Sequence, residues 1–132
     1  MLVCNTIENV KNMVTILKNK LDPTRVAYIE GKTYPKKRTQ ILDGMRSGGI
    51  QVLVVCRTCT VGTDIPLLTT VMFVDQRFQP DDVAQSAQRC LRKHKYKTFA
   101  NIVFPMYVDD ENKEITQPQS YCYQNWYGGT NC

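Results

Sequence analysis

The sequence has no hydrophobic run close to the roughly 18 to 20 residues that a membrane-spanning helix needs, and no basic segment leads into an apolar one at its N-terminus. We therefore expect no membrane partner and an intracellular protein, cytoplasmic or nuclear, of cellular or viral origin. The chain also has a single C-x-x-C pair, at Cys56 and Cys59. A zinc site commonly uses two such pairs, so we expect no metal centre and mainly reduced thiols.

Glycine is missing where a nucleotide-gripping loop would need it. Gly31, Lys32 and Thr33 spell the GKT that ends such loops, but the position five residues before Gly31 is Val26. Pro35 indicates that the next helix begins after Lys32, whereas the lysine of such a loop opens a helix. The GKT is therefore not expected to hold a triphosphate.

Charge of one sign dominates the body of the chain. Residues 1–105 carry 16 Lys or Arg against 8 Asp or Glu, a net charge of +8, and residues 106–132 carry one lysine against four acids, a net charge of −3. A basic body favours a polyanionic partner, although the same charge also suits a merely soluble surface.

Apolar patterns predict an α/β layered domain. Strands are expected at residues 1–4, 25–29, 51–55, 71–74 and 101–104, and helices at 7–21, 35–47 and from residue 80 onward. Asn5 and Glu8 resemble a capping pair for the first helix. Residues 106–132 lose this periodicity, so the domain is expected to span 1–105, with 106–132 as a linker or a tail that orders on a partner.

The expected third helix carries two contrasting faces. One face is polar and the other is expected to pack on the sheet. The polar residues are Gln85, Gln88, Arg89 and Arg92, and the apolar ones are Val83, Ala84, Ala87 and Leu91. Two guanidinium groups one turn apart suit phosphate oxygens, although such a face is often merely solvated.

A glycine-acid loop precedes this helix. Gly62 and Asp64 follow the expected strand 51–55, and open α/β sheets bind their ligands at the carboxyl ends of parallel strands. We therefore expect Asp64 and the arginines to meet at one edge of the sheet, where Asp64 accepts a hydrogen bond from a hydroxyl or an arginine.

Taken in order, these segments resemble the second RecA-like lobe of superfamily 2 helicases. The resemblance covers residues 1 to about 105 and rests on CNT at 4–6, Gly31, Arg38 in KKRTQIL, SGGIQVLVV, GTDIP, and the Q-x-x-x-R-x-x-R of 85–92. It implies a three-layer RecA-like α/β domain with a mainly parallel sheet flanked by helices, carrying helicase motifs IV to VI.

The resemblance also implies roles for single residues. Arg92, first, and Arg89, second, would act as arginine fingers on ATP whose Mg²⁺ and phosphates are held mainly by a missing first lobe. The implied ATP-binding residues are Gly62, Asp64, Gln85, Arg89 and Arg92. The implied nucleic-acid contacts are Asn5, Thr6, Gly31, Arg38 and Cys56, on DNA or RNA, with the ending CLRKHKYK mildly favouring DNA.

Two departures from the family pattern leave alternatives open. Gln88 stands where motif VI usually has glycine, and Cys56 stands where motif V often has threonine. A degenerate lobe that only binds nucleic acid is therefore a second hypothesis, and a redox protein using Cys56 and Cys59 is a third. The basic run around His94, residues 92–97, could contact phosphates or be a solvated turn.

Overall fold

The chain forms one parallel β-sheet. The computed structural model describes residues 1–59, 64–75 and 79–105. Its strands are β1 (Leu2–Cys4), β2 (Val26–Ile29), β3 (Val52–Cys56), β4 (Thr70–Phe73) and β5 (Asn101–Val103), in the order β2-β3-β1-β4-β5. All four strand pairings are parallel, which confirms the predicted sheet, with strand ends shifted by one residue at most positions.

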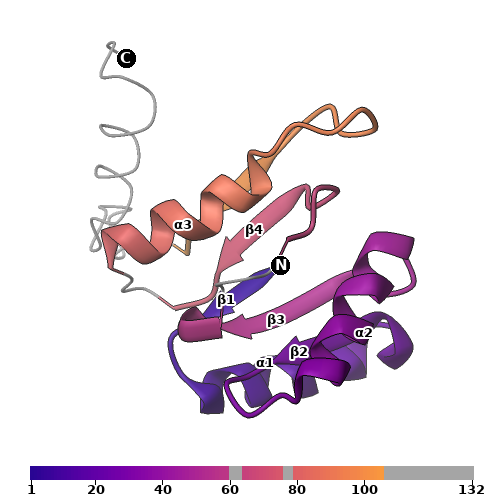
Figure 1. Ribbon diagram of the computed structural model, residues 1–132. Coiled ribbons are helices and arrows are strands. Elements are labelled where there is room, and N and C mark those ends of the chain that lie inside the picture. Colours follow the sequence, from indigo (N-terminus) through magenta and orange to yellow (C-terminus); the bar gives the residue numbers. More distant parts are fainter. Residues whose placement is uncertain (60–63, 76–78, 106–132) are drawn as a thin grey trace.

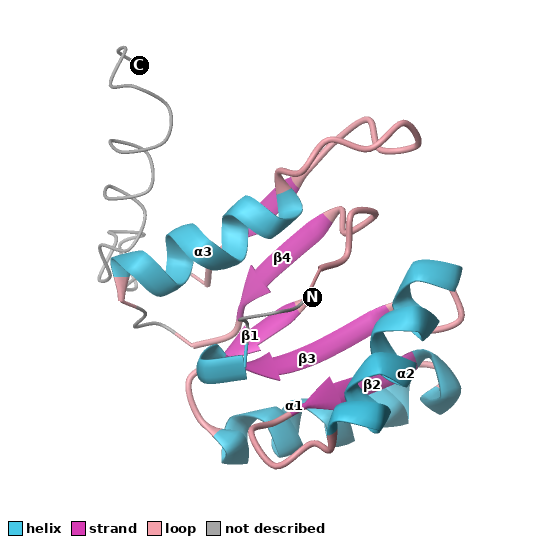
Figure 2. Cartoon of the chain, in the orientation of Figure 1, coloured by secondary structure: helices cyan, strands magenta, loops and turns pink. Residues whose placement is uncertain are grey.

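Helices cover both faces of this sheet. The described α-helices are α1 (Ile7–Lys20), α2 (Pro35–Ser47) and α3 (Pro80–Cys90), with short 3-10 turns at Pro23–Arg25 and Arg57–Cys59. Figure 1 shows α2 and α3 on one side of the strands and α1 on the other, and Figure 2 shows the same three layers by element type. The predicted three-layer α/β architecture is therefore confirmed. None of the described helices is long and apolar enough to span a membrane.

The centre of the sheet is sealed from water on both faces. Val3 of β1 pairs with Val55 of β3 on one side and with Phe73 of β4 on the other, and all three side chains are fully buried. Phe73 also stacks on Phe104, with ring centroids 4.8 Å apart. Val54, the neighbour of Val55 on β3, points to the opposite face of the sheet and is also fully buried, as expected for a strand covered by helices on both sides.

The first turn of α1 differs from the sequence prediction. The N-cap is Thr6, whose side-chain oxygen accepts a hydrogen bond from the Asn9 backbone N–H at 3.1 Å. Asn5 lies one residue too early, so its predicted capping pair with Glu8 is wrong. Both Asn and Thr can cap a helix. Because β1 ends at Cys4 and α1 begins at Ile7, Thr6 and not Asn5 directly precedes the helix.

The buried face of α3 also differs in part. Its buried residues are Val83, Ser86, Ala87 and Cys90, which follow the i, i+3, i+4, i+7 spacing of one helical face. Leu91, predicted on this face, is half exposed, because the helix ends at Cys90 and the chain turns away from the sheet there. The polar face, in contrast, lies where the sequence placed it.

The end of α2 depends on a glycine in a left-handed conformation. Gly48 caps the helix with φ of 81°, and its backbone N–H donates a hydrogen bond to the Met45 carbonyl at 3.3 Å. Glycine adopts this conformation without the steric cost that a Cβ atom adds.

We predict that Gly48→Ala lowers the free energy of unfolding by about 1 kcal/mol, because alanine is strained at positive φ. Gly49→Ala is the matched control, since a Cβ atom there meets only ordinary contacts at 3.7 Å and φ is not positive. Urea denaturation of both variants checks this, and equal losses of stability in the two variants would contradict it.

Candidate functional site

One face of α3 forms a polar hollow. Gln85, Gln88, Arg89 and Arg92 line a space of about 260 Å³ on the side of α3 that faces away from the sheet. The helix sets this arrangement, because residues three and four apart share a face. The two glutamines are exposed and Arg89 is half-buried. The hollow therefore has the positive Arg89 guanidinium at its bottom and neutral amide donors and acceptors along its wall.

Asp64 joins this face through Arg92. The Nη1 atom of Arg92 donates to Oδ1 of Asp64, and both side chains are about half exposed. A second arginine supports the same loop, because Nη2 of Arg46 donates to the Asp64 backbone carbonyl at 2.9 Å. Its Nη1 atom donates to Asp43 at 2.7 Å, which holds the guanidinium in place.

Arg92 and Asp64 meet where the strands begin, whereas the sequence suggested the carboxyl ends of the strands. Arg92 lies just beyond the end of α3, and Arg46 lies in the last turn of α2. A helix that connects parallel strands runs back along them, so its C-terminal end lies where the strands begin. Asp64 therefore lies toward the start of β4 and not at the end of β3. No sequence pattern indicated this position.

Two further guanidinium groups and one carboxylate act on Arg89. Burial lowers the pKa of Arg89 below its usual value, and the nearby positive charge of Arg92 lowers it further. Arg38 adds a smaller repulsion, whereas the Asp64 carboxylate opposes the shift. Arg38, which the sequence predicted as a nucleic-acid contact, lies close enough for its charge to act on Arg89, and its contact with nucleic acid stays a prediction. One carboxylate thus faces three cations, which is a local excess of positive charge.

The predicted nucleic-acid residues, apart from Arg38, gather at the carboxyl ends of the strands. Asn5 and Thr6 follow β1, the exposed Gly31 follows β2, and Cys56 ends β3. The Cys56 thiol donates to the Asn5 carbonyl at 3.6 Å, so the ends of β1 and β3 are tied together.

Asp75 organises this edge, and the sequence reasoning missed it. It follows β4, where its Oδ2 accepts the Asn5 backbone N–H and its Oδ1 accepts the Asn9 side-chain amide, both at 2.5 Å. The rule that selected Asn5 and Cys56, an end of a parallel strand, also applies to Asp75 and could have identified it.

The thiols offer little support for redox chemistry. Cys4, Cys56 and Cys90 are free and buried. Burial raises the pKa of the Cys4 thiol to about 12, with smaller contributions from Asp75 and Cys56, so this thiol stays neutral at physiological pH. The side chain of Cys59, like Gly62, lies outside the described part of the chain, so the predicted roles of both stay predictions.

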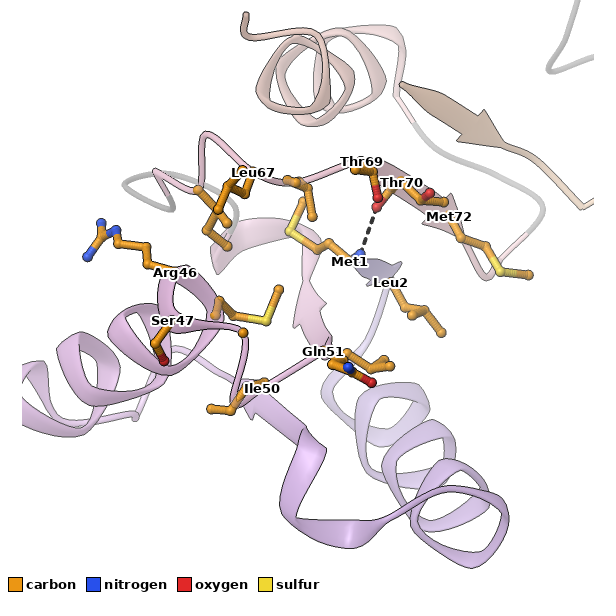
Figure 3. A pocket seen from close by; sticks show the side chains of 15 residues that line it. Met1, Leu2, Arg46, Ser47, Ile50, Gln51, Leu67, Thr69, Thr70 and Met72 are labelled. Carbon is orange, nitrogen blue, oxygen red and sulfur yellow. Dashed lines mark hydrogen bonds between the residues drawn. The ribbon is translucent and has the colours of Figure 1, made fainter. Parts of the chain in front are cut away.

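A larger pocket of about 560 Å³ lies at the starting ends of β1, β3 and β4 (Figure 3). Its wall is mostly apolar and includes Met1, whose nitrogen donates to the Thr70 carbonyl at 2.7 Å. Arg46, which donates to the Asp64 carbonyl, also lines this pocket. None of the described residues predicted from the sequence as site residues lines it.

Comparison with known proteins identifies a family match. The model of the helicase conserved C-terminal domain matches residues 1–94. The probable helicase A859L of African swine fever virus (isolate Pig/Kenya/KEN-50/1950) is 38% identical over 61 residues, which cover 46% of this chain and 7% of that protein. The chain therefore aligns with a small part of this curated relative.

Solved structures share the fold at low sequence identity. The C-terminal domain of the DEAD-box protein Dbp5 superposes with a TM-score of 0.65 at 19% identity, covering 84% of this chain and 62% of that one. The DNA-bound restriction-modification enzyme LlaBIII gives a TM-score of 0.65 at 19% identity, covering 85% of this chain and 8% of that one. These neighbours establish a RecA-like helicase C-terminal fold.

We predict that Asp75→Asn lowers the free energy of unfolding by about 2 kcal/mol, because hydrogen bonds to a charged acceptor contribute more than those to a neutral amide. Asp43→Asn is the control, since its exposed pair with Arg46 is worth less than about 1 kcal/mol. Thermal and urea unfolding of both variants measure the difference, and a larger loss for Asp43→Asn would refute it.

We also predict that Cys4 stays unmodified by N-ethylmaleimide at pH 8 in the folded protein and reacts after denaturation, because the folded thiol is neutral below a pKa of about 12. Since the unfolded thiol ionises near pH 9, this group also makes stability fall as pH rises from about 9 toward 12. Peptide mass spectrometry reports the labelling. Rapid native labelling of Cys4 would overturn the prediction, and rapid labelling of Cys56 with Cys59 would favour the redox alternative.

Proposed function

Because this chain belongs to the helicase conserved C-terminal domain family, we propose that it is the second motor lobe of an ATP-driven nucleic-acid helicase or translocase. In this proposal the lobe spans residues 1–105, and residues 106–132 are a linker or a tail that orders on a partner. The lobe acts with a first RecA-like lobe and is inactive alone, because its sequence lacks a phosphate-binding loop.

The observation that carries this proposal is the excess of guanidinium groups around Asp64. Burial lowers the pKa of Arg89, the charges of Arg92 and Arg38 lower it further, and Asp64 is the one carboxylate that opposes them. The hollow beside Arg89 and Arg92 is open to a neighbouring surface. A phosphate group placed there would add the negative charge that the cluster lacks. Arginine forks suit phosphate oxygens because they present planar, paired donors.

ATP with Mg²⁺, when bound mainly by the first lobe, supplies the phosphoryl group on which this lobe acts. Arg92 would exchange part of its contact with Asp64 for the γ-phosphate oxygens as the cleft closes, and Arg89 would follow from its half-buried position. Positive charge placed in advance stabilises the charge that develops on these oxygens in the transition state. Asp64 would keep Arg92 oriented before closure, and Gln85 would offer an amide to the nucleotide.

The other edge of the sheet would grip the nucleic acid. Asn5, Thr6 and Gly31 stand at the carboxyl ends of their strands with the start of α1. The Asn5 N–H donates to Asp75, so the backbone N–H groups of the first turn of α1 and of the Gly31 turn would meet phosphates there. The LlaBIII neighbour is bound to DNA, and this chain is proposed to use DNA or RNA. Closing and opening of the cleft between the two lobes would then move these carboxyl ends along the nucleic-acid strand.

A degenerate lobe that only binds nucleic acid remains the second candidate, and Gln88 is the residue that favours it. Its side chain lines the hollow beside the two arginines, where the family pattern has glycine. A bulkier side chain there could keep a neighbouring lobe from approaching Arg89.

We predict that Arg92→Ala, in a protein that carries this lobe together with a first lobe, lowers ATP turnover by about a thousandfold or more and leaves ATP binding intact. Loss of the exposed pair with Asp64 should leave folding unchanged within about 1 kcal/mol. A coupled-enzyme phosphate assay measures turnover, and a fluorescent ATP analogue measures binding.

Arg25→Ala is the matched control, because Arg25 is a half-exposed arginine whose pairing with Asp22 at 3.9 Å lies outside the arginine cluster. It should leave turnover unchanged. Normal turnover in Arg92→Ala would remove the motor-lobe proposal and support the degenerate-lobe alternative.

A further inference from the structure

The connection between α3 and β5 carries a concentrated positive charge. Residues 83–108 contain no acidic residue, and Lys93, Lys95 and Lys97 fall within five positions. Figure 1 shows this connection projecting beyond the ends of β4 and β5, on the side where the strands begin. It therefore lies at the opposite edge from Asn5, Thr6, Gly31 and Cys56, and it directly follows Arg92 without containing any residue of the arginine cluster.

This Lys93–Lys97 turn is an ordered element. The Lys97 backbone N–H donates to the His94 carbonyl at 3.0 Å, and the Tyr96 N–H donates to Nδ1 of His94 at 3.3 Å. The Nζ atom of Lys97 donates to the carbonyls of Cys90 at 2.8 Å and Leu68 at 3.2 Å, which ties the base of the turn to α3 and to the segment before β4. A surface that is ordered before binding loses less entropy when a ligand arrives.

The tip of the turn presents an aromatic ring beside a cation. Tyr96 is 74% exposed, and the Nζ atom of Lys95 lies 4.6 Å from the ring centroid. The His94 ring lies 5.6 Å from the Tyr96 ring, tilted by 48°. Lys93 and Lys95 are both exposed. Lys97 is committed to backbone carbonyls, so Lys93 and Lys95 are the lysines that can reach a ligand.

We propose that the Lys93–Lys97 turn is a second contact surface for single-stranded nucleic acid. Lys93 and Lys95 pair with backbone phosphates, and Tyr96 stacks on a base. Exposed aromatic side chains flanked by cations provide this combination, because any base offers a face for stacking and phosphates are regularly spaced. An acidic peptide would use the lysines but would leave the ring of Tyr96 without a stacking partner.

The test measures binding of a fluorescein-labelled oligothymidine to this chain by fluorescence anisotropy over a series of salt concentrations. Lys93→Gln/Lys95→Gln should weaken binding by about tenfold or more at low salt and lower the salt slope by about 1.4, because two single-strand phosphate contacts are lost. Tyr96→Ala should weaken binding by about tenfold with the salt slope unchanged, and Tyr96→Phe should retain the wild-type affinity.

Matched controls separate this surface from net charge. Lys18→Gln/Lys20→Gln removes the same charge from the end of α1, on the other face of the sheet, and should change affinity by less than about twofold. An equal loss in this control would overturn the proposal. So would Lys93 and Lys95 variants that lose binding to polyglutamate while oligothymidine binding stays intact, since the partner would then be an acidic protein.

The result is independent of the motor-lobe proposal. In a protein with both lobes, Lys93→Gln/Lys95→Gln should keep full ATP turnover at saturating oligothymidine, because neither lysine belongs to the arginine cluster. Loss of turnover in Arg92→Ala with normal binding tests the arginine fingers, whereas loss of binding with normal turnover tests the turn. Each proposal can therefore fail while the other stands.

Discussion

The repulsion among three guanidinium groups, opposed by one carboxylate, is the constraint around which the candidate site is organised. Arg89 stands at its centre, half-buried on α3, where burial lowers its pKa and the charges of Arg92 and Arg38 lower it further. Asp64 lowers this cost but leaves positive charge in excess. Because like charges near a protein surface repel more strongly than they do in bulk water, the cluster favours any anion that can enter the hollow. Arg92 and Asp64 are about half exposed to water, whereas Arg89 is partly desolvated, so an anion can reach the cluster from the side of Arg92.

The sheet connects this cluster to the opposite edge as a rigid body. Val3, Val55 and Phe73 are fully buried side by side in the central strands, so β1, β3 and β4 resist movement relative to one another. Asp75 and Cys56 then tie the ends of these strands to Asn5. A displacement of the arginine face on cleft closure would therefore reach the carboxyl edge as rotation of the whole lobe, with no internal rearrangement required.

The sequence allowed prediction of whatever depends on local periodicity. Residues 51–55 are an unbroken apolar run, which predicts a strand covered on both faces, and the spacing of Gln85, Gln88, Arg89 and Arg92 predicts one helical face. Contacts between distant segments were not predictable. Arg46 reaches Asp64 eighteen positions away because of the path of the chain between β3 and β4, and Leu91 is exposed because α3 ends one residue earlier.

The two departures from the family pattern leave the central chemistry of the cluster intact. Glycine in place of Gln88 would cost about 1 kcal/mol of helix stability in α3, so the glutamine strengthens the helix that carries both arginines. Its exposed amide also adds donors to the hollow. Cys56 gives up a hydroxyl, but its thiol joins the Asn5 carbonyl and holds two strand ends together. Neither change removes a charge from the group formed by Arg38, Arg89, Arg92 and Asp64, so a role for this group in phosphate chemistry does not require the usual residues at the two altered positions.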